Sequence, residues 1–316
     1  MPARLTTALT ALALAGATML SACGEDAPAA PPASTLEAVQ VTGAESKEPT
    51  VKVDAPIDLP RTESEVIDQG DGAEIQQDDL VSLQAVLVNG ADGKTLTSTW
   101  KQGPVGLDLG SEGLFASFKS QLPGKTVGSR VVIASTPADA YGDTGNEELG
   151  VGKDDPVIFV LDLVGATKVL DSAQGTDVAP KKGLPTVKMN DGKPATITVP
   201  KGAKAPKNTV VQPLIEGEGA KVKEGQTVRV SYTGALFRNG KVFDSSANRP
   251  QQPYFEFPVG QGQVIKGWDD SIVGQKVGSR LLLVIPPKDG YGSAGSGDTI
   301  KGNDTLVFVV DILAAY

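Results

Sequence analysis

Histidine is absent from the 316-residue sequence, and cysteine occurs once, at Cys23. Without imidazole the chain has neither the usual general base nor a Ser-His-Asp triad, and it lacks the commonest ligand of transition metals. A single cysteine cannot form an intramolecular disulfide. Any chemistry of this chain must therefore work without imidazole or thiolate, and we expect no metal and no cofactor.

A basic cluster of the kind that follows a phosphate backbone is also missing. The sequence has 29 Lys and Arg against 38 Asp and Glu, with a formal net charge of −9 and a pI near 4.7. We therefore expect no nucleic-acid partner. The contents of 40% hydrophobic and 21% charged residues are ordinary globular values, and the length suits two domains.

The first 22 residues are typical of a secretory signal peptide. Arg4 supplies the positive charge, and an apolar segment runs from Leu5 to Leu20. The sequence "LSAC", which ends at Cys23, resembles the bacterial lipobox, in which the cysteine becomes the lipidated N-terminus. The alternative is an ordinary signal peptide with an incidental cysteine. The lipobox predicts an extracytoplasmic protein that is lipid-anchored to the cell membrane through Cys23.

Two segments have the composition of connectors. Residues 23–46 are rich in alanine, proline and acidic residues and poor in large apolar groups, which predicts a disordered tether. Residues 167–183 are polar and interrupted by proline and glycine, which predicts a linker. No segment after the signal peptide is a transmembrane candidate.

The rest of the chain repeats itself. Four pairs of segments match, in the same order: "PTVKV" (49–53) with "PTVKM" (185–189), "VGSR" (127–130) with "VGSR" (277–280), "YGD" (141–143) with "YGS" (291–293), and "IFVLDLVGA" (158–166) with "VFVVDILAA" (307–315). We therefore expect two homologous domains, at residues 47–166 and 184–316.

The second copy has mostly strand signals. "QTVRVSYTGALF" alternates apolar with polar residues, and Asn239-Gly240 is a strong hairpin-turn signal. Only "GWDDSIVGQKVG" is typical of a helix, and it is short; we interpret the acidic pair in "DDSI" as a solvated face. The pattern predicts an α+β fold, with an antiparallel sheet curled over one short helix.

Four segments of the second copy carry a family resemblance: "VSYTGALFRNGKVFDSS", "PVGQGQVIKGWDDSIVGQKVGSRLLLVIPP", "GYGSAGSG" and "NDTLVFVVDIL". In this order they closely resemble the FKBP family, the peptidyl-prolyl cis-trans isomerases that bind tacrolimus and rapamycin. The resemblance covers about residues 211–313, and the first copy is similar to the family more weakly. It implies two tandem FKBP-like domains, each an antiparallel β-sheet wrapped around one short α-helix, with a proline pocket between the two.

The resemblance also implies which residues of the second copy form that pocket. The expected catalytic residues are Tyr232, Phe243, Asp244, Trp268, Tyr291 and Phe308, and the expected substrate-binding residues are Phe255, Val264, Ile265 and Ile300. Trp268 would be the floor, Ile265 would donate its backbone N–H to the carbonyl next to proline, and the Tyr291 hydroxyl would donate to ligand. Taken singly, the aromatic residues could be core filling, and Asp244 could be a turn residue.

The first copy departs from the family pattern at polar pocket positions. The matching segments place Ala85 opposite Tyr232 and Thr97 opposite Asp244. At the other pocket positions the first copy mostly replaces apolar residues by apolar residues, which preserves a core. We therefore expect a folded domain with little or no isomerase activity.

The second copy departs from the pattern in one loop, residues 293–304. Ser296 and Thr299 stand there where many relatives have a histidine and an isoleucine. In the family this loop contacts the residues that flank proline, so we expect an altered preference for those residues.

The implied reaction breaks no covalent bond. Rotation about a peptide bond faces roughly 18–20 kcal/mol, and exchange at X–Pro bonds takes tens to hundreds of seconds. We therefore expect an isomerase that accelerates the folding of exported proteins at the outer face of the membrane. Its partners would be proline-containing polypeptides, with tacrolimus- and rapamycin-like macrolides as inhibitors. The alternative is a surface-tethered lipoprotein that binds clients or partners, with isomerisation incidental.

Overall fold

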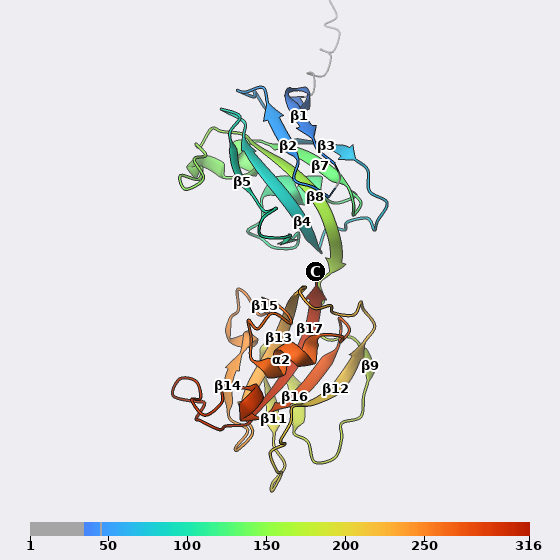
Figure 1. Ribbon diagram of the computed structural model, residues 1–316, viewed down its shortest axis with the longest axis vertical. Helices are drawn as coiled ribbons and strands as arrows, with labels where there is room; N and C mark the ends of the chain where they lie inside the picture. The colour runs from blue at the N-terminus through green and yellow to red at the C-terminus, as the bar shows by residue number, and fades with distance from the viewer. Residues whose placement is uncertain (1–34, 45) are drawn as a thin grey trace, which may run out of the picture. The chain divides into compact units, whose positions relative to one another are not determined.

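The computed structural model describes residues 35–44 and 46–316 (Figure 1). The predicted signal peptide, Cys23 and the first part of the predicted tether lie outside these residues. In the part that the structure describes, no helix is long and apolar enough to cross a membrane.

The first copy is built on an antiparallel sheet with the strand order β3-β7-β8-β4-β5, and β6 also pairs with β4. Its strands are β3 (Glu63–Asp68), β4 (Asp79–Asn89), β5 (Thr95–Ser98), β6 (Val105–Asp108), β7 (Arg130–Ser135) and β8 (Val157–Lys168). Its helices are α1 (Ala116–Gln121) and the 3-10 turns η1 (Thr35–Ala38), η2 (Pro137–Asp139) and η3 (Gly142–Thr144).

The second copy repeats this design with the order β14-β13-β17-β16-β12-β9, and β15 pairs with β13. Its strands are β9 (Gly175–Asp177), β12 (Val210–Gly217), β13 (Thr227–Leu236), β14 (Val242–Ser245), β15 (Phe255–Pro258), β16 (Arg280–Ile285) and β17 (Leu306–Ala315). Its helices are α2 (Lys266–Ile272) and the 3-10 turns η4 (Ser246–Asn248) and η5 (Pro287–Asp289). The α+β prediction of two tandem domains, each a sheet around one short helix, is confirmed.

The central strands are apolar without alternation because both faces of each sheet are buried. On β16, Leu281, Leu283 and Ile285 point to the inner core beside α2, whereas Leu282 and Val284 belong to a second core on the outer face. Figure 1 shows α2 lying across the inner face of its sheet. The inner core therefore shapes the pocket, and the outer core is covered by another element.

That covering element is a hairpin, and each copy has one. In the first copy it is β1 (Val39–Thr42) with β2 (Thr50–Val53), and in the second it is β10 (Thr186–Asn190) with β11 (Lys193–Thr198). Their apolar side chains pack on the outer cores of the respective sheets. The hairpins explain why apolar residues recur in segments that the family resemblance does not cover.

The first hairpin corrects two predictions. The tether does not extend to residue 46, because Leu36 is buried in the outer core and residues 39–42 form β1. The match of "PTVKV" with "PTVKM" is also wrong, since the former is the second strand of its hairpin and the latter is the first strand. Both are short strands of similar composition, so their four identical residues do not mark equivalent positions in the two hairpins.

The predicted linker at residues 167–183 is partly built into the two sheets. Strand β8 continues to Lys168, and β9 pairs with β12 as an extra edge strand. Between them, the N–H of Leu170 donates to the Leu313 carbonyl at 3.1 Å, and that of Gln174 donates to the Gly278 carbonyl at 2.9 Å. Polar and glycine-rich composition does not distinguish a linker from an exposed edge strand, which explains the error.

Candidate functional site

One pocket of the second copy gathers nearly all of the expected site residues. It lies between α2 and the inner face of the sheet and has a volume of about 440 Å³. The residues that line it are Tyr232, Phe243, Asp244, Phe255, Gln263, Val264, Ile265, Trp268, Tyr291 and Phe308. Nine of these were expected from the sequence, and Gln263 was not. Ile300 is not among these lining residues; it is buried in the same core cluster as Trp268 and Phe308, with 7% of its surface exposed.

Trp268 forms the floor of this pocket from the first turn of α2. Only 4% of it is exposed, and its ring meets those of Tyr232 and Phe308 edge-on, each at 5.2 Å between centroids. Within the described chain its indole N–H has no hydrogen-bond partner. A buried donor without a partner costs about 1–3 kcal/mol, so the indole is not the residue that stability alone would favour here.

Two glycines allow the rings and the helix to come this close. A Cβ on Gly234 of β13 would lie 2.7 Å from ring atoms of both Phe243 and Phe308. A Cβ on Gly267 of α2 would lie 2.5 Å from Cγ2 of Ile285 on β16. Both positions require glycine because the neighbouring side chains occupy the space that a Cβ would need.

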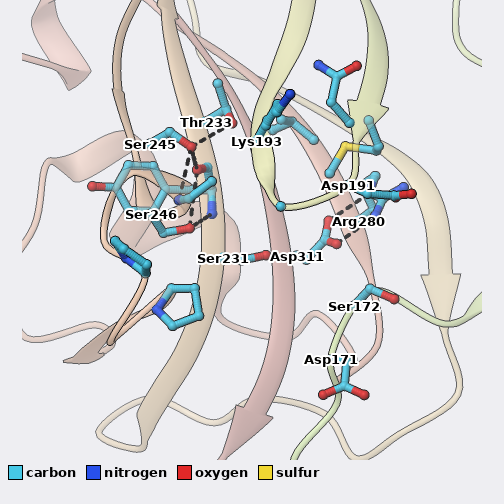
Figure 2. Close-up of a pocket in the computed structure, with 18 residues that line it drawn as sticks. Asp171, Ser172, Asp191, Lys193, Ser231, Thr233, Ser245, Ser246, Arg280 and Asp311 are labelled. Atoms are coloured by element: carbon cyan, nitrogen blue, oxygen red, sulfur yellow. Dashed lines mark hydrogen bonds and ion pairs between the residues drawn. The ribbon is translucent and has the colours of Figure 1, made fainter.

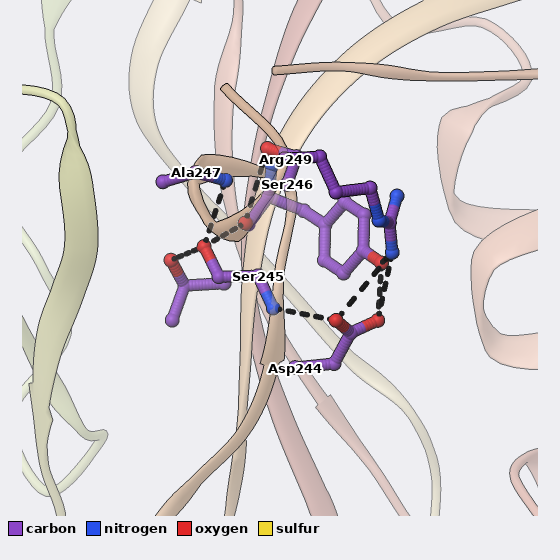
Figure 3. A network of polar contacts seen from close by, with 7 residues as sticks. Asp244, Ser245, Ser246, Ala247 and Arg249 are labelled. Carbon is purple, nitrogen blue, oxygen red and sulfur yellow. Dashed lines mark hydrogen bonds and ion pairs between the residues drawn. The ribbon is translucent and has the colours of Figure 1, made fainter. Parts of the chain in front are cut away.

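The polar side of the pocket is a network around Asp244, which Figure 3 shows. The Tyr232 hydroxyl donates to Oδ2 of Asp244, and the backbone N–H of Ser245 donates to Oδ1 at 2.8 Å. Burial and the hydrogen bond to Asp244 raise the pKa of Tyr232 to about 12. The carboxylate is therefore held in one orientation at the pocket rim by a phenol that stays protonated at neutral pH.

Arg249 completes this network and was missed by the sequence analysis. Its Nη2 donates to the Tyr232 hydroxyl at 2.9 Å and lies 3.4 Å from Oδ2 of Asp244. The signal in the sequence was an arginine five positions after the carboxylate, in an irregular segment. The direction of a side chain cannot be predicted in such a segment, so Arg249 could not be assigned.

Two further donors face the pocket. Ile265 is the N-cap residue of α2, and its N–H has no hydrogen-bond acceptor among the described residues. The Tyr291 hydroxyl likewise makes no hydrogen bond in that part of the chain; burial and the negative charge of Asp244 raise its pKa. Both groups are available to a ligand carbonyl, as the family resemblance implies.

Asp269 corrects the interpretation of "DDSI" as a solvated face. Its side chain accepts the N–H groups of Gly260 and Gly262, each at 2.7 Å, and only 8% of the residue is exposed. Asp270 does face solvent, in an ion pair with Lys266. Asp269 thus fixes the turn that leads into α2 and positions Val264 and Ile265 at the pocket.

Strand registers test the proposed equivalences between the copies. Leu87 pairs with Thr97 as Gly234 pairs with Asp244, so Thr97 occupies the carboxylate position. In the same way, Ala85 pairs with Leu161 of β8, and Tyr232 pairs with Val310 at the corresponding position of β17. The alignment at these two polar positions is therefore confirmed.

In the first copy the equivalent space is filled by rings. Phe115, in the position of Ile265, lies 4.9 Å from Tyr141, 5.7 Å from Phe118 and 5.9 Å from Phe159 between ring centroids. These three rings correspond to Tyr291, Trp268 and Phe308. The Phe115 side chain thus packs among the same three ring positions that surround the pocket of the second copy.

Comparison with known proteins supports the same assignment. A family model for the FKBP-type peptidyl-prolyl cis-trans isomerase matches residues 72–164 and 218–313, together more than half of the chain. The chain belongs to the FKBP-type isomerase family. It is a peptidyl-prolyl cis-trans isomerase with two FKBP repeats, a family that binds proline-containing substrates and FK506-like macrolides.

Individual relatives agree with this family. An FK506-binding protein of Streptomyces anulatus is 41% identical over 114 residues, which cover 36% of this chain and 90% of the relative. A probable FK506-binding protein of Corynebacterium glutamicum is 43% identical over 111 residues, 35% of this chain and 90% of the relative. A crystal structure of the three FKBP domains of wheat FKBP73 aligns with 81% of this chain and 94% of its own, at 21% identity and a TM-score of 0.34.

Proposed function

We propose that the second copy carries the isomerase activity of this chain and that the first copy is a folded domain without an open proline pocket. The observation that carries the proposal is the contrast at one position. Ile265 leaves the aromatic pocket open, whereas the Phe115 ring packs into the equivalent ring cluster. The carboxylate and phenol of the second pocket also have no counterpart at Thr97 and Ala85.

The mechanism we propose is differential binding of the twisted amide. When the X–Pro bond rotates, amide resonance is lost. The carbonyl double bond becomes localised, the nitrogen becomes pyramidal, and the twisted amide needs less hydration than the planar one. A dry pocket floored by Trp268 therefore binds the twisted form better than the planar one. Ile265 N–H and the Tyr291 hydroxyl would bind the flanking carbonyls, and Asp244 would lie beside the rotating carbonyl. Each 1.4 kcal/mol of such preference is about tenfold in rate.

We further propose that the chain acts outside the cytoplasm, tethered through a lipid on Cys23, on exported polypeptides that fold slowly at X–Pro bonds. The support is the signal-like segment and the lipobox-like "LSAC". One observation favours the client-binding alternative. The first copy keeps a complete core, although rings occupy the position of its pocket. A holding or spacing role would tolerate that change.

Separate expression of the two halves tests the division of labour. The boundary follows the sheets: residues 35–168 contain the first sheet with its hairpin, and residues 169–316 contain the second with β9. We expect both halves to unfold cooperatively and nearly all turnover of a proline tetrapeptide, with nearly all tacrolimus binding, to reside in residues 169–316. Comparable rates and affinities from the two halves would overturn the proposal.

A further inference from the structure

A second pocket lies on the opposite face of the second sheet, behind the isomerase site. Ser231 and Thr233 of β13 line it, whereas Tyr232 between them sends its side chain to the proline pocket. Its other wall is the tip of the β10–β11 hairpin, and its volume is about 650 Å³ (Figure 2). The isomerase mechanism uses none of the side chains on this outer face.

The floor of this outer pocket holds an ion pair with unused hydrogen-bond donors. Arg280 donates through Nε and Nη2 to the two carboxylate oxygens of Asp311, both at 2.7 Å. Asp311 is 2% exposed, whereas the Arg280 side chain is 16% exposed. The remaining N–H groups of Arg280 have no hydrogen-bond partner in the described chain, so part of a guanidinium faces an open polar pocket.

The first copy shows what the equivalent arginine binds. Arg130 makes the same two bonds to Asp162, at 2.6 and 2.8 Å. Its other donors bind backbone carbonyls, those of Gly43 at 3.3 Å, Ala44 at 3.4 Å and Lys47 at 2.9 Å. The Arg130 side chain is consequently only 3% exposed. In that copy the guanidinium is a receptor for a short run of polypeptide backbone.

The difference comes from the length of one hairpin. Thr42 pairs with Thr50 in the first copy, and between them Gly43, Ala44 and Lys47 reach Arg130 with their carbonyls. Asn190 pairs with Lys193 in the second copy, which leaves only Asp191 and Gly192 as the turn. The shorter turn supplies no carbonyl to Arg280, and Asp191 and Gly192 line the outer pocket instead.

A second contact of the loop has no counterpart in the second copy. Ser98 donates to the carboxylate of Glu48 at 2.6 Å and so ties the loop to β5. The equivalent Ser245 is fully buried, and its hydroxyl donates to the Tyr232 carbonyl at 2.8 Å instead. At the pocket rim, Met189 is 41% exposed and offers adaptable apolar surface to a passing chain.

We propose that the outer pocket of the second copy is a second polypeptide-binding site, which takes a turn of an unfolded client chain by its backbone carbonyls. Arg280 would bind the carbonyls as Arg130 binds those of Gly43, Ala44 and Lys47. Because backbone groups are bound, the site requires no proline in the client and has little sequence specificity. It lets the domain hold a client on one face while the opposite face isomerises an X–Pro bond.

The probe is the chain's own loop as a free peptide, acetyl-VTGAESKE-amide, the sequence of residues 41–48. It contains no proline and no free carboxyl terminus, so neither the proline pocket nor a terminal charge explains its binding. We expect millimolar peptide to shift the NMR amide signals of Gly192 and Ser231 saturably in the full chain. Inorganic phosphate, added alone, should not reproduce these shifts.

Two variants block the outer pocket while Arg280 and Asp311 themselves are retained. In one, residues 43–49 replace the Asp191–Gly192 turn; in the other, Ser231→Phe fills the floor, with Ser231→Ala as the matched control. We expect at least tenfold weaker peptide binding in both blocked variants, wild-type binding in the alanine control, and tetrapeptide isomerase rates within twofold of wild type in all three. The proposal is overturned by an absence of saturable shifts, by undiminished binding in Ser231→Phe, or by an equal response to phosphate, which would indicate an anion site.

Discussion

Replacing Trp268 by phenylalanine should separate catalysis from stability. The first copy has Phe118 at this position, which is 6% exposed and packs edge-on against Phe159 at 4.7 Å, so a phenyl ring is compatible with the fold. The change removes up to about 50 Å² of aromatic surface, given that aromatic side chains bury 150–250 Å². At 25 cal/mol per Å² this is about 1 kcal/mol.

The same change also removes the indole N–H, which has no partner in the described chain. Removing this buried, unpaired donor should stabilise the folded domain by about 1–3 kcal/mol, which offsets the loss of buried area. The free energy of unfolding of the second domain should therefore stay the same or rise by up to about 2 kcal/mol. The pocket floor, however, loses contact with the twisted proline amide, so kcat/KM should fall up to about tenfold.

The assay combines tetrapeptide isomerisation with calorimetric unfolding of the full chain. The control is Phe257→Leu, because Phe257 packs against Trp268 at 5.7 Å between ring centroids but does not line the pocket. This control should lower the unfolding temperature while retaining most of the activity. If Trp268→Phe instead destabilised the domain by several kcal/mol with full activity, the indole would be core filling and the reasoning would be refuted.

Two other predictions address the tether and the phenol. In the native host, Cys23→Ser should move the protein from the membrane fraction to the medium or to an unprocessed precursor, whereas normal processing with full membrane retention would exclude lipidation. Tyr232 has a folded-state pKa of about 12 against 10.0 unfolded, so its contribution to stability is complete below pH 10 and is lost as the pH rises to about 12. Tyr232→Phe should make the free energy of unfolding fall less steeply between pH 10 and 12; an unchanged slope would contradict the assigned burial and hydrogen bond.

Most of the site residues that the sequence predicted correctly lie on regular elements. Tyr232, Phe243 and Phe308 sit on strands, where alternation fixes the side of the sheet, and Trp268 follows from its place in a short amphipathic helix. The family resemblance then supplied their common pocket. Ile300 belongs to an irregular loop, where the spacing of residues does not determine which side chains point inward; it packs in the core cluster of Trp268 and Phe308.

The parts that the sequence did not predict depend on contacts with the backbone. Asp269 was interpreted as solvated because its partners are N–H groups of two glycines, which no sequence pattern marks. Strand β9 was interpreted as linker because an edge strand needs only one bonded neighbour and can be polar. The two hairpins were aligned wrongly because their strands are short and similar in composition, whereas their registers are unambiguous.

The central claim is that turnover takes place in the second pocket and not in the first. The most direct measurement is kcat/KM for a proline tetrapeptide in the full chain with Phe243→Ala or, as the matched change in the first copy, Leu96→Ala. Phe243 packs edge-on against Phe308 at 5.5 Å in the pocket wall, and Leu96 packs against the core of the first copy. We predict at least a tenfold loss for Phe243→Ala and an unchanged value for Leu96→Ala. Equal losses, or a loss confined to Leu96→Ala, would contradict the account.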